Sequence, residues 1–150
     1  MYYKMSADMK RFDQLLAETE GAYHAIAQAM GLPDSGFQVL YTLCTLGDGS
    51  PLSQVVQQAG LPKQTVNSAL RKLERERILT LEAVGGRKKA LRLTGEGWDL
   101  CRQKIFPVLE MEDEVFGAWT QEERDTYLRL TQRYLEDFRE RTQTRFGRKP

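Results

Sequence analysis

The sequence has few residues of the kinds that build catalytic, metal or disulfide sites. It contains only two cysteines, Cys44 and Cys101, and a single histidine, His24. Two cysteines form neither a disulfide framework nor a metal-ligand set, so we expect buried inert thiols, with redox sensing as the alternative. His24 lacks Cys or His neighbours at ligand spacing, which favours a structural or partly exposed histidine over a metal or effector ligand. The sequence also contains no Ser-His-Asp set, no phosphate-binding glycine loop and no paired carboxylates in an apolar setting. We therefore expect a protein that is not an enzyme and uses no cofactor.

Long apolar runs are missing as well. The longest uncharged apolar stretches are too short to span a membrane, and no charged-then-apolar leader opens the chain. We therefore expect a cytoplasmic protein. The 150 residues, 41% of them hydrophobic, suffice for one domain with a real core or for a small domain with an oligomerisation element.

Positive charge is concentrated in one part of the chain. The net charge is only +1, but residues 62–92 carry nine Lys and Arg against three Glu. The remainder of the chain has an excess of acidic residues. This asymmetry is typical of a nucleic-acid footprint confined to one face. The alternative is a solvated charged helix, because Arg71, Lys72, Arg75 and Arg77 alternate with glutamates.

The first half of the chain has helical patterning. Apolar residues at three- and four-residue steps predict a helix from Ala7 to Met30. Ser35 stands three residues before Gln38, the spacing of a capping box that would begin a second, buried helix. A turn over 47–50, a short helix over Leu52–Ala59 and a stop at Gly60 are predicted next.

The following helix has one apolar and one polar face. Its inward residues are Val66, Ala69, Leu70 and Leu73. Its outward residues are Lys63, Gln64, Thr65, Asn67, Ser68 and Arg71. Two helices joined by a tight turn, the second with polar residues in its first two turns, form the helix-turn-helix arrangement.

A basic hairpin follows this helix. Leucines alternate with polar residues on both sides of Gly85 and Gly86, which provide a turn. Three consecutive cations stand beside the turn: Arg87, Lys88 and Lys89. A helix sized for the major groove joined to a basic ribbon is typical of a winged helix-turn-helix DNA-binding protein.

The C-terminal third is predicted to be helical. Thr94 is expected to cap a long helix that Pro107 kinks, and Thr120 with Glu123 forms a second capping box before a last helix. That last helix has its own apolar residues, which we expect to face inward: Tyr127, Leu130, Tyr134, Leu135 and Phe138.

These patterns predict a mainly α protein with a small β-hairpin, organised in four parts. Residues 1–34 form an N-terminal dimerisation helix, 35–96 the winged helix-turn-helix domain, 97–142 the C-terminal dimerisation helices, and 143–150 a disordered tail. The end helices have more apolar surface than the small central module can cover, so we expect a twofold homodimer. The alternative is a compact monomer in which these helices fold back.

The order of elements is similar to that of the MarR family of bacterial transcriptional regulators, over nearly the whole chain. "LPKQTVNSALRKLERERIL" resembles the family's recognition helix, and "RKKALRLTGEG" resembles its wing, with Arg87, Leu93, Thr94 and Gly97 at signature positions. Two positions depart from the family pattern. Gly85 replaces an acidic residue that often pairs with the wing arginine, and Arg77 stands where a glycine usually ends the recognition helix.

The resemblance implies a homodimer that places two recognition helices in successive major grooves of a pseudo-palindromic operator, and repression is the expected outcome. Gln64, Asn67 and Ser68 are then candidates for base edges. Arg71 would contact guanine or phosphate, and Lys63 and Thr65 phosphates. Arg87 is expected in or near the minor groove, with Lys88 and Lys89 on the DNA backbone.

The resemblance also implies a small aromatic or amphipathic effector that releases DNA. Candidate lining residues are Tyr23, Phe37, Tyr41 and Trp98, although aromatics at helical spacing are more often core residues. The alternative function is a winged-helix protein-interaction module without specific DNA binding. The basic wing and the polar helix face argue against that alternative.

Overall fold

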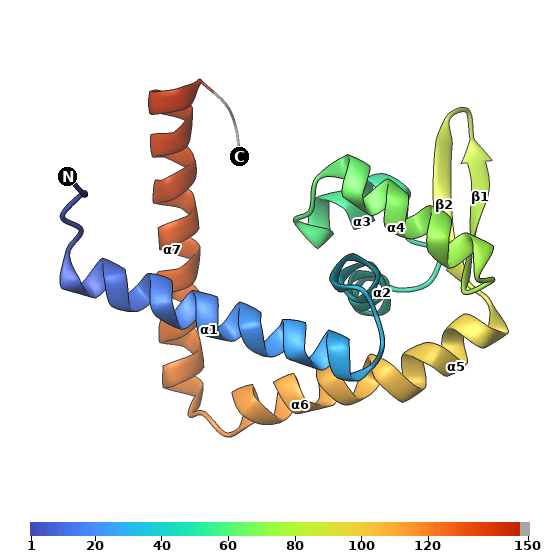
Figure 1. The fold of residues 1–150 in the computed structure, drawn as a ribbon, viewed down its shortest axis with the longest axis horizontal. Helices are drawn as coiled ribbons and strands as arrows, with labels where there is room; N and C mark the ends of the chain where they lie inside the picture. The colour runs from blue at the N-terminus through green and yellow to red at the C-terminus, as the bar shows by residue number, and fades with distance from the viewer. Residues whose placement is uncertain (148–150) are drawn as a thin grey trace. The chain divides into compact units, whose positions relative to one another are not determined.

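A computed structural model describes residues 1–147 (Figure 1). Over these residues the chain forms seven helices and one two-stranded antiparallel sheet, and it divides into two compact units, residues 1–107 and residues from 108 onward. In chain order the elements are α1 (Ala7–Ala29), α2 (Asp34–Leu46), α3 (Leu52–Ala59), α4 (Lys63–Arg75), β1 (Leu79–Gly85), β2 (Lys88–Leu93), α5 (Gly95–Lys104), α6 (Phe106–Gly117) and α7 (Gln121–Phe146). This confirms the mainly α winged-helix fold that the sequence predicts.

Helix α1 begins at Ala7 as predicted and ends at Ala29, one residue before the predicted Met30. Ser6 is its N-cap, and the Ser6 hydroxyl accepts a hydrogen bond from the Met9 N–H at 3.2 Å. Gly31 follows the helix with a φ of 68°, a conformation that glycine adopts without strain. At this end of the helix, Lys104 of α5 donates to the Met30 carbonyl at 2.5 Å. The C-terminus of α1 is therefore fastened to α5.

The predicted start of α2 was wrong by two residues. The N-cap is Pro33 rather than Ser35, and the Pro33 carbonyl accepts the first helical hydrogen bond, from the Phe37 N–H at 2.9 Å. The extended backbone of Pro33 (ψ 147°) turns directly into the helix. Asp34 follows as the first helical residue, and its carboxylate accepts from the His24 ring at 2.7 Å. Ser35 therefore lies inside the first turn, where it cannot cap the helix.

Helices α3 and α4 form the helix-turn-helix. Gly60 ends α3 in the left-handed conformation (φ 66°), and Pro62 is the N-cap of α4. The apolar face of α4 is buried as predicted, with Val66 fully inaccessible and Leu70 only 2% exposed. Burial of this face leaves the polar side of α4 in solvent.

Arg77 ends α4 in a conformation that suits glycine better. Its φ of 60° is the only positive value of a non-glycine residue among those described. The Arg77 N–H donates to Glu74 and the Ile78 N–H to Leu73, the paired hydrogen bonds of a Schellman motif. The helix thus keeps the usual terminating motif although its sequence lacks the usual glycine.

We expect the Arg77→Gly variant to be more stable than the natural protein by about 0.5–1 kcal/mol, because it removes the strain of a left-handed arginine. Arg75→Gly is the matched control, since it removes the same charge within the regular helix and should destabilise by a similar amount. Urea unfolding of both variants checks the opposite signs. Destabilisation by both would show that Arg77 is not strained.

Strands β1 and β2 form the wing. Leu79 pairs with Leu93 and Leu81 with Leu91, and the register shifts between Ala83 and Gly85. Gly85 and Gly86 both have positive φ, as the turn requires. A bridge between Pro51 and Ala90 adds a third chain segment to the sheet that the sequence did not predict. Through this bridge the start of α3 is held against the base of the wing.

One hydrophobic core joins the elements of the first unit. Its largest fully buried side chains come from every element from α2 to α5: Val39, Leu40, Thr42, Leu43, Val55, Val66, Leu70, Leu79, Leu91, Cys101 and Ile105. Helix α5 belongs to this unit and begins at Thr94, whose hydroxyl accepts from the Gly97 N–H at 3.0 Å. The wing and α4 are therefore held in position by packing against this shared core.

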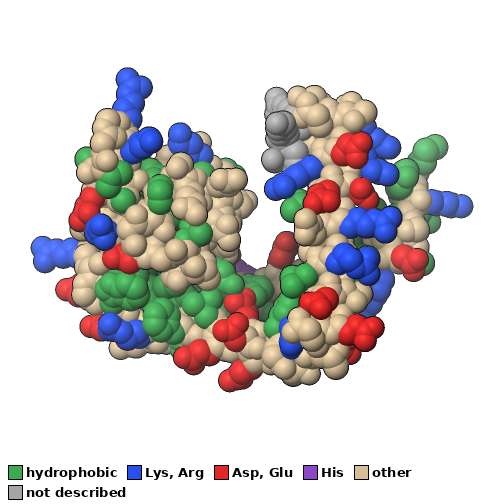
Figure 2. Space-filling model, turned by 180° about the vertical axis from the view of Figure 1, so that it is seen from behind, with side chains coloured by type: hydrophobic (Ala, Val, Ile, Leu, Met, Phe, Trp, Pro, Cys, Tyr) green, Lys and Arg blue, Asp and Glu red, His purple; other side chains and the backbone are tan. Residues whose placement is uncertain are grey.

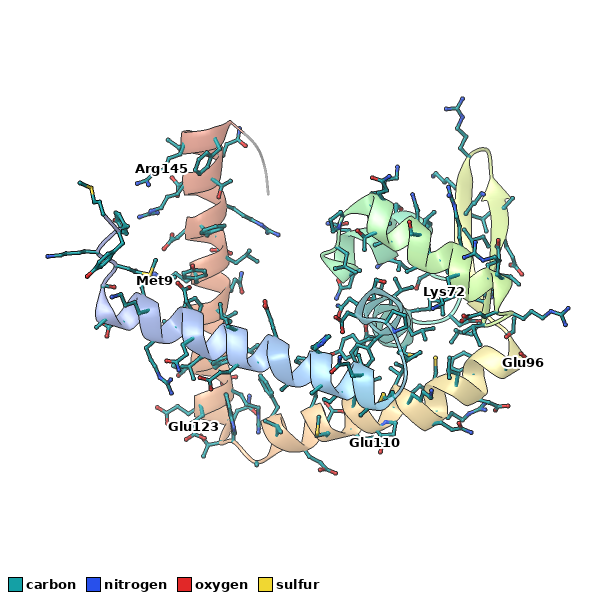
Figure 3. The ribbon with its side chains drawn as sticks, in the orientation of Figure 1. Met9, Lys72, Glu96, Glu110, Glu123 and Arg145 are labelled. Carbon is teal, nitrogen blue, oxygen red and sulfur yellow. The ribbon has the colours of Figure 1, made fainter. Side chains whose placement is uncertain are left out.

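The predicted break near Pro107 is confirmed. Helix α5 ends at Lys104 and α6 begins at Phe106, so Pro107 lies in a first turn, where its missing N–H leaves no hydrogen bond unmade. Thr120 and Glu123 form the predicted capping box of α7. Figure 3 shows Glu123 at the start of this helix and Arg145 in its last turn.

The predicted tail was wrong over its first residues. Helix α7 continues through Phe146, and Gly147 ends it in the left-handed conformation with its N–H donating to Gln143. Gln and Arg are good helix formers, so polar composition alone did not indicate disorder here. Residues 148–150, the rest of the predicted tail, lie outside the described part. Among the described helices, none has the length and apolar content needed to cross a membrane.

Candidate nucleic-acid interface

The exposed side of α4 presents the polar residues that the sequence singles out. Asn67 is half-buried, and the other five are exposed: Lys63, Gln64, Thr65, Ser68 and Arg71. All of them lie in the first three turns, because the apolar residues of α4 turn toward the core. The arrangement provides amide and hydroxyl groups that can hydrogen-bond base edges, with cations at both ends of the row.

A groove lies between the helix pair α3–α4 and the wing, and we call it the wing groove. It has a volume of about 540 Å³. Its lining comes from α3 and the residue before it, the first residue of α4, and the wing: Pro51, Leu52, Ser53, Val56, Lys63, Val84, Arg87, Lys88 and Lys89. The structure thus brings Lys63 together with the three wing cations, whereas the other polar residues of α4 lie outside the groove.

The four cations of the wing groove are available to bind an anion. In residues 1–147, no ion pair joins Lys63, Arg87, Lys88 or Lys89 to a carboxylate. All four side chains are exposed. Figure 2 shows Lys and Arg side chains projecting from the end of the wing, at the upper left of that view. Unpaired cations around a groove favour a polyanion such as a nucleic-acid backbone.

The wing is braced at its base rather than at its tip. Arg92 donates to Glu82 on the neighbouring strand at 2.6 Å and lies 3.7 Å from Asp48. The hydrogen bond and charge of Glu82, followed by the charge of Asp48, raise the pKa of Arg92 above its ordinary value. Asp48 also accepts from the Leu93 N–H at 2.7 Å. These contacts join the two strands and the α2–α3 turn at the base of the wing.

Sequence reasoning did not identify the start of α3 as part of this surface. Leu52 and Ser53 line the wing groove beside Lys63. Pro51 is the N-cap of α3, makes no side-chain cap and also lines the groove, so the positive end of this helix lies at the groove. The signal in the sequence is a Pro-Leu-Ser start to a helix, but only the bridge between Pro51 and Ala90 places it beside the wing.

A second groove lies between α1 and α2, and we call it the α1–α2 groove. It has a volume of about 520 Å³ and includes two of the four aromatic effector candidates, Tyr23 and Phe37. Tyr41 is half-buried one turn further along α2, with its ring 6.1 Å from that of Phe37, and Trp98 is half-buried on α5; neither lines this groove.

His24 also lines the α1–α2 groove. Its side chain is 52% exposed and hydrogen-bonded to Asp34. Among the described residues, no group of three or more His, Cys, Asp or Glu side chains is arranged to hold a metal ion. The histidine is therefore a partly exposed polar link between two helices.

The two cysteines lie together, which the sequence did not indicate. Cys44 of α2 and Cys101 of α5 are free thiols, and Cys101 is fully buried. Hydrogen bonding to Cys101 and burial raise the pKa of the Cys44 thiol above its ordinary value. A raised pKa keeps the Cys44 thiol protonated, whereas the same hydrogen bond lowers the pKa of the Cys101 thiol. Cys101 is nevertheless shielded from solvent by its full burial, which favours the interpretation as an inert core thiol.

No family model matches the sequence, and the sequence matches no curated protein. Solved structures do match the fold. The chain is similar to a MarR/EmrR family transcriptional regulator from Acinetobacter sp. ADP1, with a TM-score of 0.69, 18% identity, and coverage of 89% of this chain and 98% of that one. It is similar to S. aureus MepR in a DNA complex, with a TM-score of 0.68, 18% identity, and coverage of 90% and 99%.

A third similar structure is the PcaV transcriptional regulator from Streptomyces coelicolor in complex with its natural ligand. Its TM-score is 0.64, with 19% identity and coverage of 89% of this chain and 98% of that one. All three likenesses extend over nearly the full length of both chains. The molecule is thus a winged helix-turn-helix protein. Its fold is that of the MarR-family transcriptional regulators.

Proposed function

We propose that the protein is a sequence-specific DNA-binding transcriptional regulator, a repressor that acts as a homodimer on a pseudo-palindromic operator. The observation that carries this proposal is the joint exposure of the polar side of α4 and the four unpaired cations of the wing groove. Phosphates supply most of the affinity in such interfaces, and base edges supply the specificity. The likeness to MepR, whose structure is a DNA complex, supports this use of the fold.

The residues of α4 divide between bases and backbone. Gln64, Asn67 and Ser68 lie on the exposed or half-exposed side of the helix and contact base edges in the major groove. Lys63 and Thr65, at the helix start, bind phosphates, where the helix dipole also favours an anion. Arg71, one turn after Asn67, reaches a guanine or a phosphate.

The wing contacts the neighbouring backbone and minor groove. Lys63 and the wing cations share one groove, so a phosphate strand can lie between α4 and the wing. Arg87, beside the turn, enters or approaches the minor groove, and Lys88 and Lys89 contact the backbone. The ion pair between Arg92 and Glu82 holds the wing in place for these contacts.

A homodimer is supported by the apolar side chains that α7 exposes. The prediction that the apolar residues of α7 face inward was wrong for the single chain, because no residue of α7 is buried. Tyr127, Leu130, Tyr134 and Phe138 recur at helical spacing and are each 44–52% exposed. A self-complementary stripe of this kind suits a twofold interface. A dimer would place two recognition helices about one turn of DNA, roughly 34 Å, apart.

A small aromatic or amphipathic effector is supported by the α1–α2 groove, which brings Tyr23 and Phe37 together. PcaV, to which the fold is similar, was solved with its natural ligand. A ligand that binds one spacing of the recognition helices better than another would release DNA by population shift.

The first test of the whole proposal measures the affinity of the protein for DNA upstream of its gene by fluorescence anisotropy, with a random duplex as competitor.

We expect Arg87→Ala to weaken DNA binding by about 1–3 kcal/mol and to reduce the salt slope by about one, because one phosphate or minor-groove contact is lost. The matched control is Arg102→Ala, which removes an exposed arginine of α5 that does not line the wing groove. Anisotropy titrations across a salt series measure both effects. Equal affinity of the two variants would remove the wing from the interface.

A further inference from the structure

The α1–α2 groove has an acidic lining. Glu20 of α1 and Asp34 of α2 both line it, and no Lys or Arg is among its described lining residues. His24 is the only potential cation there, and its ring is already 2.7 Å from Asp34. Even with His24 protonated, two carboxylates leave the lining negative. A carboxylate ligand would meet charges of its own sign in this groove.

The groove also presents aromatic faces and open space. Tyr23 of α1 is half-buried and offers part of its ring to the groove, whereas Phe37 of α2 is only 3% exposed and forms apolar floor beneath it. Ala17 and Gly21 contribute the smallest side chains of the lining, and a Cβ placed on Gly21 would meet no atom within 4 Å. Aromatic rings attract cations through their faces, most strongly where water is partly excluded.

We propose that the α1–α2 groove binds a hydrophobic organic cation, with the Tyr23 ring against its apolar groups and Glu20 and Asp34 beside its charge. The observed volume of about 520 Å³ admits a ligand of several rings. The binding claim stands on the groove alone. Its consequence for DNA rests on the proposed function.

That consequence follows from what Asp34 does in the free protein. Its carboxylate accepts from His24, which links α1 to the start of α2. Helix α2 packs in turn against α3 and α4 of the DNA-binding module. A cation that takes His24's place at Asp34 loosens the link between α1 and α2, and so changes where α4 is held relative to α1.

The test is a calorimetric titration of the full chain, without DNA, with two ions of the same size and opposite charge. Tetraphenylphosphonium is expected to bind saturably, one per chain, and tetraphenylborate at least about tenfold more weakly. Glu20→Gln should weaken tetraphenylphosphonium binding about fivefold. Glu18→Gln, which removes an exposed carboxylate of α1 outside the groove, should leave it unchanged.

Either of two results would overturn the binding claim: tetraphenylborate binding as tightly as its isostere, or Glu20→Gln binding the cation as the unaltered chain does. Anisotropy of the DNA complex then tests the consequence. We expect tetraphenylphosphonium to displace DNA, at about fivefold higher concentration for Glu20→Gln. Cation binding without displacement would contradict the effector role. Absence of DNA binding at the outset would instead contradict the proposed function and leave the titration intact.

Discussion

The Leu130→Asp variant is expected to be monomeric at micromolar concentration, with a dimer dissociation constant raised at least about a hundredfold. Leu130 lies in the middle of the exposed stripe of α7, between Tyr127 and Tyr134, and its side chain is 47% exposed in the single chain. A twofold interface contains every substitution twice. Two aspartates would then be buried opposite an apolar surface, and a short carboxylate cannot extend out to water as lysine does.

Burial of the stripe would contribute to the stability of a dimer. Burying the remaining surface of each half-exposed side chain contributes on the order of 1 kcal/mol, and four such residues come from each copy. Trp119 and Tyr127, with ring centroids 5.3 Å apart, and Tyr134 and Phe138, with centroids 6.0 Å apart, keep the stripe ordered before association. The cost of ordering side chains on binding is correspondingly small.

The control for this prediction is Gln132→Asp. Gln132 is exposed on the other side of α7, and the substitution adds the same charge to the same helix. Sedimentation velocity measures the association state of both variants, and anisotropy measures their DNA affinity. We expect Leu130→Asp to lose at least about a hundredfold in operator affinity, because each half-site then binds alone. A Leu130→Asp protein that remains dimeric would exclude the α7 stripe as the interface.

The Gly97→Ala variant is expected to lose about 3 kcal/mol of stability, with a fall in Tm of about 10 °C. A Cβ at position 97 would stand 2.0 Å from the Ile78 carbonyl oxygen and 3.2 Å from Cδ2 of Leu93. That carbonyl cannot retreat easily, since it accepts from the Thr94 N–H at 3.0 Å. The added methyl group must therefore push α5 away from the turn that joins α4 to the wing.

Gly95→Ala is a close control, because Gly95 lies in the same first turn of α5 and a Cβ there meets no atom within 4 Å. Alanine at this position should be neutral or slightly stabilising, since it lowers the entropy of the unfolded chain. Thermal unfolding followed by circular dichroism compares the two. Similar melting temperatures would mean that the Gly97 contact relaxes without cost and that the α5–wing junction is not tight.

The helices and the wing were predictable because local patterns determine them. In α4 the three- and four-residue spacing of Val66, Leu70 and Leu73 is unambiguous, and tertiary contacts only complete the burial that the spacing predicts. The hairpin was equally clear, since alternating leucines on both sides of Gly85 and Gly86 leave one register with a buried face. The capping box at Thr120 is a purely local motif.

Features that depend on long-range contacts were not predictable. Ser35 resembled a cap, but Pro33 begins the helix and Asp34 is used for a contact with His24 ten positions away. The bridge between Pro51 and Ala90 involves a single residue pair and so leaves no periodic signal. The proximity of the two cysteines depends on how α2 and α5 pack.

The site shows the same division between local and long-range information. Which residues of α4 face solvent followed from the helical period, so the candidate base contacts could be chosen from sequence. The wing groove could not be predicted from the sequence, because Lys63 and the wing cations come from segments more than twenty residues apart. The α1–α2 groove likewise joins two helices, and only its aromatic members Tyr23 and Phe37 stood out in the sequence.

Selection of DNA from a randomised duplex pool at physiological salt tests the central claim, sequence-specific binding, most directly. The protein is incubated with the pool, and the retained duplexes are sequenced over successive rounds. We predict enrichment of one pseudo-palindrome with half-sites about 10 base pairs apart, centre to centre, as two recognition helices in successive major grooves require. A retained pool as random as the starting one would contradict specific recognition by α4.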